Sequence, residues 1–158
     1  MADTYRVERS TTIHASAELI FSYIADFHRW TAWSPWEGLD PEMRRTYSGP
    51  DSGPGATYAW AGNRKAGEGR MEVTDQVEPS RLQVALDFLK PFKSSSTTTF
   101  DLTPEGESTR VTWTMTGRKT LMTRVMGIFT SMDKMIGPDF EKGLGRLRAV
   151  AEGPASTN

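Results

Sequence analysis

The chain has 158 residues, of which 37% are apolar and 10% aromatic, which is enough for one domain with a single core. With 19 Lys and Arg against 20 Asp and Glu, the net charge of -1 argues against partners held mainly by charge, such as nucleic acid. The lack of cysteine excludes disulfides, thiolate metal sites and cysteine nucleophiles, and no apolar run approaches the roughly 20 residues of a membrane span. We therefore expect a single cytoplasmic domain over residues 1–158, without nucleic acid or integral membrane contacts.

The first elements in the chain are predicted to be a strand, a short helix and an aromatic loop. Residues 4–14 alternate in polarity, which predicts a strand. Ser16 is placed to cap an amphipathic helix that ends near Asp26. Residues 26–40 contain three tryptophans around Pro35, which argues against a continuous helix and favours a loop with at most one helical turn.

Six further strands are predicted between residues 43 and 117, where polarity alternates with period two between turn signals. Their approximate ranges are 43–48, 56–62, 69–77, 82–89, 94–103 and 109–116. The short connections predict an antiparallel meander with one apolar face. The Ser and Thr run at 94–99 fits a strand better than a linker, because Phe100 and Leu102 continue its alternation.

The last element is a long amphipathic helix predicted over residues 119–152, followed by a frayed tail. Gly137 and Pro138 interrupt its pattern, so a kink or a new helix start is expected there. Such a helix measures about 45–50 Å, whereas an eight-residue strand spans about 26 Å. The sheet must therefore curl around the helix, and the enclosed volume predicts an internal pocket.

Several segments resemble the bacterial SRPBCC family of START and Bet v 1-like proteins, of the type described as polyketide cyclase/dehydrase and lipid transport. These segments are 26–30 (DFHRW), 33–36 (WSPW), 55–63 (GATYAWAGN), 88–93 (FLKPFK), 109–113 (TRVTW), 132–135 (MDKM) and 139–144 (DFEKGL). The resemblance covers nearly the whole chain and implies an α+β helix-grip fold, in which a curved seven-stranded antiparallel sheet wraps around a long C-terminal helix, with short helices between the first two strands. It also implies an apolar cavity, but no single reaction. Pro138 departs from the uninterrupted helix that is usual in the family.

Aromatic and methionine side chains are the candidates for the cavity wall, because flat ligands stack on rings and thioethers adapt to different shapes. We expect the lining to comprise Trp33, Trp36, Tyr58, Trp60, Met71, Phe88, Phe100, Trp113, Met122, Met126, Phe129, Met132 and Asp133. Ordinary core packing is the competing interpretation for each tryptophan and methionine.

Four polar residues are candidates for acid–base chemistry, although no pair of them forms a convincing catalytic site. Asp133 falls within the apolar stripe of the last helix and is expected to pair with an arginine or orient a ligand. Asp75 continues the apolar face of its strand, Tyr58 lies on the apolar face of another strand, and His28 is a candidate acid or base at the predicted mouth. The two histidines lack metal-ligand spacing, so we expect neither a metal nor a cofactor.

The function favoured by this pattern is binding or transport of a hydrophobic or amphipathic small molecule, such as a lipid, an isoprenoid or an aromatic polyketide-like compound. The alternative is an enzyme of the polyketide cyclase, aromatase or dehydratase type. A second alternative is a protein-interaction or stress-response module that uses the tryptophan loop or a sheet edge. The sequence leaves open whether the chain is a monomer or a homodimer.

Overall fold

The computed structural model describes residues 4–35, 42–63, 67–90, 93–118 and 132–153. Its elements are β1 (Thr4–Ile13), α1 (Ala17–Ala25), the 3-10 helix η1 (Phe27–Ala32), β2 (Arg44–Ser48), β3 (Thr57–Ala61), β4 (Glu68–Val77), β5 (Arg81–Lys90), β6 (Ser94–Glu105), β7 (Ser108–Arg118) and α3 (Met132–Glu152).

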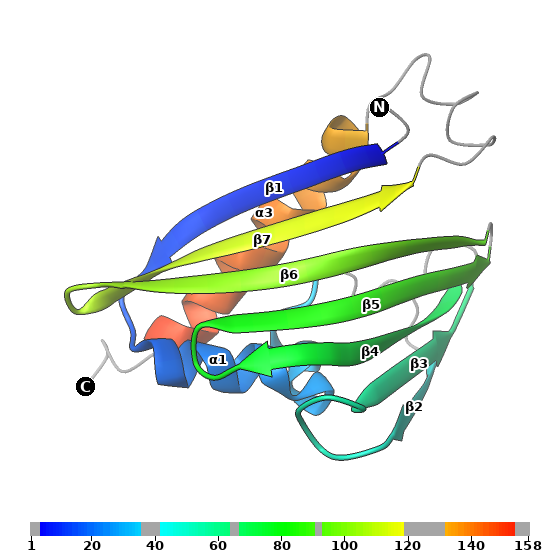
Figure 1. The fold of residues 1–158 in the computed structure, drawn as a ribbon, viewed down its shortest axis with the longest axis horizontal. Coiled ribbons are helices and arrows are strands. Elements are labelled where there is room, and N and C mark those ends of the chain that lie inside the picture. The colour runs from blue at the N-terminus through cyan, green and yellow to red at the C-terminus, as the bar shows by residue number, and fades with distance from the viewer. Residues whose placement is uncertain (1–3, 36–41, 64–66, 91–92, 119–131, 154–158) are drawn as a thin grey trace.

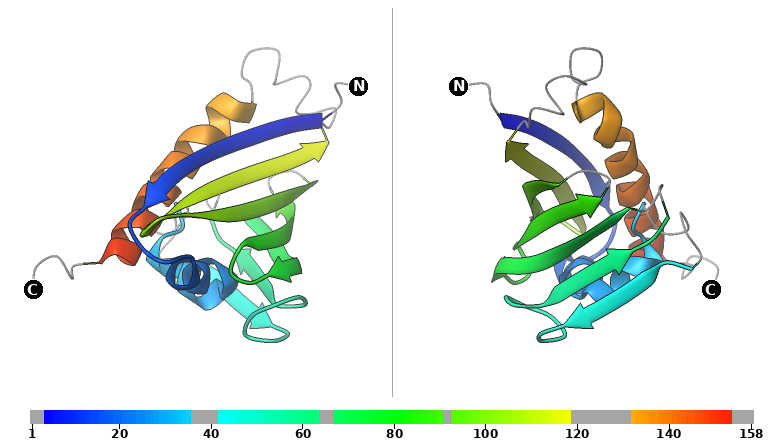
Figure 2. Two further views of the ribbon diagram at one scale, coloured as in Figure 1. Left: turned by 60° about the vertical axis from the view of Figure 1, so that its left-hand side comes forward. Right: turned by 90° about the vertical axis from the view of Figure 1, so that its right-hand side faces the viewer.

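All seven strands belong to one antiparallel sheet in the order β1-β7-β6-β5-β4-β3-β2. The first strand pairs with the last, and the remaining strands follow one another as a meander (Figure 1). The sheet is curved, and α3 runs along its concave side and packs against β1 (Figure 2). This arrangement confirms the predicted helix-grip fold, with short helices between the first two strands.

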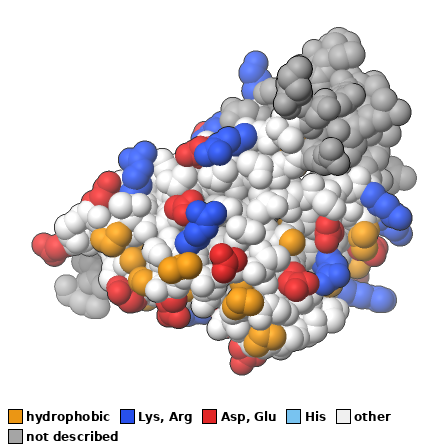
Figure 3. Space-filling view, viewed as in Figure 1, with side chains coloured by type: hydrophobic (Ala, Val, Ile, Leu, Met, Phe, Trp, Pro, Cys, Tyr) orange, Lys and Arg blue, Asp and Glu red, His pale blue; other side chains and the backbone are white. Residues whose placement is uncertain are grey.

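The two faces of the sheet differ as the alternation predicts. The outer face carries acidic and basic side chains with scattered apolar ones between them (Figure 3). The inner face consists of rows of residues that are paired across neighbouring strands. One row is Val7, Met115, Thr98, Val84 and Val73, and the next is Tyr5, Gly117, Ser96, Leu86, Met71, Tyr58 and Tyr47. These two rows are thus mainly apolar, with a few hydroxyl groups, and Arg9 and Arg45 lie in phase with them on β1 and β2.

The segment after α1 is more regular than the predicted loop. The side chain of Asp26 caps η1 by accepting a hydrogen bond from the backbone N–H of His28. The Nε1 atoms of Trp30 and Trp33 donate to the carbonyl oxygens of Ile24 and Tyr23, at 2.8 and 3.0 Å. These bonds anchor both indoles against the end of α1.

Helix α3 runs through Pro138, so of the two expected outcomes, a kink or a new helix start, the new start is not observed. Residues 119–131 of the predicted helix lie outside the described residues. Gly137 lies against the guanidinium group of Arg9, and a β-carbon at position 137 would overlap it. The Nε atom of Arg9 is 2.8 Å from Oε2 of Glu141, one turn further along α3. The absence of a side chain at Gly137 therefore leaves room for the guanidinium group of Arg9 against the surface of α3.

Candidate ligand-binding site

The inner space next to α3 is filled by four aromatic side chains that we call the closed core. They are Trp33, Phe100, Trp113 and Phe140, each at most 1% exposed. Trp113 stacks on Phe140 with ring centroids 4.0 Å apart, and Trp33 meets Trp113 edge to face at 5.5 Å. In the described structure the predicted lining residues Trp33, Phe100 and Trp113 therefore pack against one another, and their part in a ligand cavity stays a prediction.

Further along the sheet, four other predicted lining residues lie together on the inner face. We call Tyr58 and Trp60 of β3 and Phe88 of β5 the aromatic shelf, and Met71 of β4 lies opposite Tyr58 in the register. Trp60 stacks on Tyr58 at 5.9 Å and meets Phe88 edge to face at 5.5 Å. Tyr58 and Met71 are buried, whereas Trp60 and Phe88 remain partly exposed. The shelf therefore offers large apolar surfaces that the described fold does not fully cover.

Gly69 makes the contact between Trp60 and Phe88 possible. It lies between them on β4 and pairs with both. A β-carbon at position 69 would lie 2.7 Å from Cη2 of Trp60 and 2.5 Å from the carbonyl oxygen of Asp87. The indole thus crosses β4 at the one position without a side chain. A glycine inside a strand is the sequence signal for such a close approach. Gly69 was not among the predicted site residues.

Inward-facing hydroxyl groups border the shelf on β6, where Ser94, Ser96 and Thr98 form what we call the hydroxyl row. Ser94 pairs with Phe88 and Ser96 with Leu86, so polar and apolar side chains lie next to each other on the inner face. These hydroxyl residues were not among the predicted lining residues, although the alternation through Phe100 places them on the inner face. Polar groups at fixed points on an apolar wall are what orients an amphipathic ligand.

Tyr5 on β1 extends the hydroxyl row, because its side chain crosses β7 and forms a hydrogen bond with Ser96 on β6. Its ring lies over Gly117, where a β-carbon would be 2.7 Å from the phenolic oxygen. Burial raises the pKa of Tyr5 above its usual value, and the hydrogen bond to the Ser96 side chain lowers that pKa by less. The phenol therefore remains neutral under ordinary conditions and serves as a hydrogen-bonding group.

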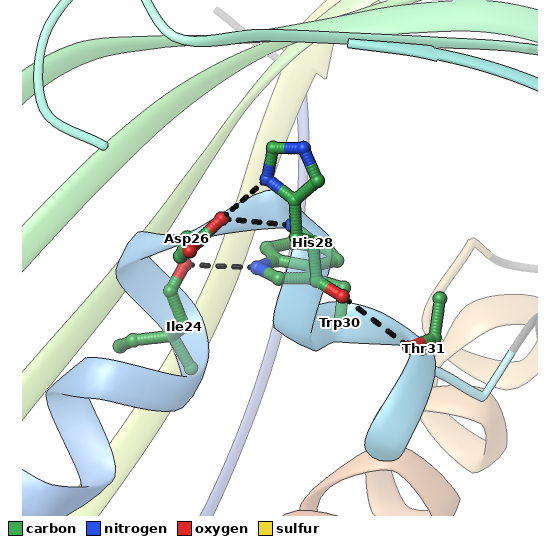
Figure 4. Close-up of polar contacts among 5 residues, drawn as sticks. All are labelled: Ile24, Asp26, His28, Trp30 and Thr31. Carbon is green, nitrogen blue, oxygen red and sulfur yellow. Dashed lines mark hydrogen bonds and ion pairs between the residues drawn. The ribbon is translucent and has the colours of Figure 1, made fainter. Parts of the chain in front are cut away.

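The predicted polar candidates are dispersed. Asp75 is exposed, because the pairing of β4 with β5 shifts register between Val73 and Asp75, so the expectation that Asp75 continues the buried face is wrong. His28 lies on η1, where its Nδ1 is 2.8 Å from Oδ1 of Asp26 (Figure 4). Its ring stacks on Tyr47. Tyr58 belongs to the shelf.

The remaining predicted lining residues cannot be placed on this site. Trp36, Met122, Met126 and Phe129 lie outside the described residues, as do the side chains of Met132 and Asp133. The methionine wall and the role of Asp133 stay predictions. Within the described residues, no three His, Asp or Glu side chains converge as a metal ion would require. No helix of that part of the chain is both long and apolar enough to cross a membrane.

A curved antiparallel sheet that holds a C-terminal helix, with apolar and hydroxyl side chains on its inner face, defines a helix-grip protein of the Bet v 1-like class. The chain belongs to the polyketide cyclase / dehydrase and lipid transport family, whose model matches residues 4–152. A comparison with curated proteins gave no match.

Solved structures agree with this fold. The ginseng (Panax ginseng) major latex-like protein 151 has a TM-score of 0.69 at 12% identity, covering 96% of this chain and 100% of that one. Protein CV1439 from Chromobacterium violaceum has a TM-score of 0.66 at 14% identity, covering 97% and 99%. The Aha1 dimer from Colwellia psychrerythraea has a TM-score of 0.62 at 16% identity, covering 94% and 96%. At these identities the likeness extends to the fold alone.

Proposed function

We propose that the chain binds an apolar or amphipathic small molecule against the aromatic shelf, with the hydroxyl row holding the polar part of the ligand. The observation that carries this proposal is the incomplete burial of Trp60 and Phe88 on the inner face, next to a fully enclosed core. Covering 100 Å² of such apolar surface contributes about 2.5 kcal/mol at roughly 25 cal/mol per Å². A lipid, an isoprenoid or an aromatic polyketide-like compound has this chemistry.

Binding is favoured over cyclase or dehydratase catalysis by the chemistry of the inner face. Proton transfer to a carbon skeleton needs an acid and a base within hydrogen-bond reach of it. Among the described residues, the shelf and the hydroxyl row contain phenols and aliphatic hydroxyls, but no carboxylate or imidazole. The family description includes both enzymes and lipid transport, and these groups fit the second role.

A titration with a neutral apolar dye tests the proposal. N-phenyl-1-naphthylamine fluoresces more strongly in an apolar site, so saturable enhancement at one site per chain is expected. Phe88→Ala removes one ring of the shelf and is expected to weaken dye binding by about tenfold, since the lost contact is worth roughly 1–2 kcal/mol.

Leu89→Ala is the matched control, because Leu89 is the next residue in β5 and its side chain is 43% exposed. This variant is expected to bind the dye like the wild type. Equal affinities in all three proteins would contradict the proposal. The molar mass of the dye complex in solution would also decide between a monomer and a homodimer, either of which is compatible with the shelf.

A further inference from the structure

A small pocket lies between η1 and the turn that joins β2 to β3. It has a volume of about 120 Å³, and its walls are formed by Phe27, His28, Tyr47, the 48–51 turn and the start of β3. Pockets for drug-sized ligands measure about 300–1,000 Å³, so this pocket has room for a small molecule or for the end group of a larger one. The ring of Tyr47, which lines the pocket, lies 5.2 Å from the ring of Tyr58 in the aromatic shelf, measured between centroids, so the pocket adjoins the shelf.

The wall opposite His28 is fixed by backbone hydrogen bonds. The N–H of Gly55 donates to the carbonyl oxygen of Val73, and the N–H of Val73 donates to the carbonyl oxygen of Ala56, both at 2.9 Å. The hydroxyl of Thr57 donates to the carbonyl oxygen of Gly55 at 3.0 Å. The turn is therefore held to β4, and the pocket is formed before any ligand arrives.

His28 is held in one orientation at the edge of this pocket. Oδ1 of Asp26 accepts hydrogen bonds from the backbone N–H of His28 at 2.9 Å and from its Nδ1 at 2.8 Å (Figure 4). Because an ionised carboxylate only accepts hydrogen bonds, Nδ1 carries the proton and Nε2 keeps its lone pair in the neutral ring. The ring also stacks on Tyr47 with centroids 3.9 Å apart and planes at 20°. Nε2 is thus a positioned hydrogen-bond acceptor.

The charges around the pocket favour a neutral hydrogen-bond donor over an anion. Asp51 lines the pocket and Asp26 lies behind the imidazole. Arg29, the residue after His28, directs its guanidinium elsewhere, over the ring of Tyr23 at 4.3 Å and onto the Ser22 hydroxyl at 3.0 Å. Two carboxylates, beside a described lining that includes no Lys or Arg, would repel a carboxylate or phosphate ligand.

We propose that this pocket binds a neutral hydroxyl group of the phenol or alcohol type, and that Nε2 of His28 accepts its hydrogen bond. The buried side chains of Phe27 and Ala56 contact the carbon atoms of the ligand. The pocket adjoins the aromatic shelf at Tyr58, but its proposed ligand is held by His28, so this proposal does not depend on the function proposed for the shelf.

A comparison of phenol with anisole tests this assignment, because anisole has the same ring but cannot donate a hydrogen bond. The wild type is expected to bind phenol about 5- to 10-fold more tightly than anisole, because one additional hydrogen bond contributes roughly 1 kcal/mol. His28→Phe keeps a ring on Tyr47 but lacks Nε2, and it is expected to lose this preference. His14→Phe, at the other histidine of the chain, and Phe88→Ala on the shelf are expected to keep it.

Nitrogen-15 spectra of the two imidazoles give a second measurement that needs no change at His28, with His14→Phe used for assignment. Phenol is expected to shift the His28 Nε2 resonance and to leave both His14 resonances in place. Equal affinity of the wild type for phenol and anisole, an unchanged preference in His28→Phe, or tighter binding of benzoate than of phenol would each overturn the proposal. A lack of saturable phenol binding, or an unshifted Nε2 resonance, would do so as well.

Discussion

At the scale of single residues, the shelf depends on one missing side chain. Trp60 reaches Phe88 only because Gly69 leaves the surface of β4 open beneath the indole. A β-carbon at position 69 would also collide with the carbonyl oxygen of Asp87. That backbone atom cannot move without distorting the pairing of β4 with β5. Two strands that are not neighbours in the sheet therefore present a single aromatic surface.

Tyr5 gives a prediction at the same scale. Burial raises its pKa, so the folded protein holds the phenolic proton more tightly than the unfolded chain. The associated stability is fully present below the usual tyrosine pKa of about 10 and is lost as pH rises through the higher pKa of the folded state. Absorbance at 295 nm is expected to show that Tyr5 ionises at a higher pH than a free tyrosine, and Tyr5→Phe is expected to remove that contribution.

Ser96→Ala provides the control for the Tyr5 titration. The hydrogen bond from Ser96 lowers the pKa of Tyr5, so its loss is expected to move the ionisation of Tyr5 to still higher pH. An unchanged titration in Tyr5→Phe, or a shift to lower pH in Ser96→Ala, would contradict the assigned causes.

At the scale of elements, alternation and capping predict all seven strands and the first helix, but they carry little information about register. The hydroxyl row faces inward because β6 continues the phase of Phe100, and that phase was available from the sequence. The register shift before Asp75 could not be predicted from the sequence, because it arises from the pairing of β4 with β5. Likewise, η1 depends on the anchoring of Trp30 and Trp33 by carbonyl groups of α1, a tertiary effect.

Helix α3 offers a prediction from two glycines that differ in surroundings. A β-carbon on Gly143 would lie 2.8 Å from Cζ3 of Trp113 and 2.8 Å from Cδ of Pro35, whereas one on Gly145 would meet nothing within 4 Å. Gly145→Ala is expected to raise the free energy of unfolding by about 0.5–1 kcal/mol through helix propensity. Gly143→Ala is expected to lower it by about 1–3 kcal/mol through overpacking.

Denaturant unfolding of the two alanine variants measures both effects in one helix. The denaturant midpoint of the wild type is expected to lie between those of the two variants, and all three proteins are expected to have similar m-values. If Gly143→Ala were as stable as Gly145→Ala, the close approach of α3 to Trp113 would be incorrect.

At the scale of the whole molecule, stability and binding are assigned to different parts of the same inner face. The closed core lies where α3 crosses the sheet, and the end of α3 is fastened to its surroundings. Nη1 of Arg146 donates to the carbonyl oxygen of Ser34 at 2.7 Å, and Glu152 accepts the backbone N–H of His14 at 2.9 Å. The shelf lies towards β3 and β5, away from these contacts, so a ligand there adds contacts without replacing those of the core.

This separation predicts that an apolar ligand on the shelf stabilises the folded protein by an amount that grows with the logarithm of its concentration relative to Kd. A ligand that binds only the folded state contributes about 2.7 kcal/mol when its concentration is one hundred times its Kd. For a chain of this length, that corresponds to an increase in Tm of roughly 5–10 °C. Saturating N-phenyl-1-naphthylamine is therefore expected to raise the Tm of the wild type and of Leu89→Ala equally, and that of Phe88→Ala less at the same concentration. If the dye bound tightly but left the Tm unchanged, it would be binding the unfolded chain as well, and the shelf would not be a folded-state site.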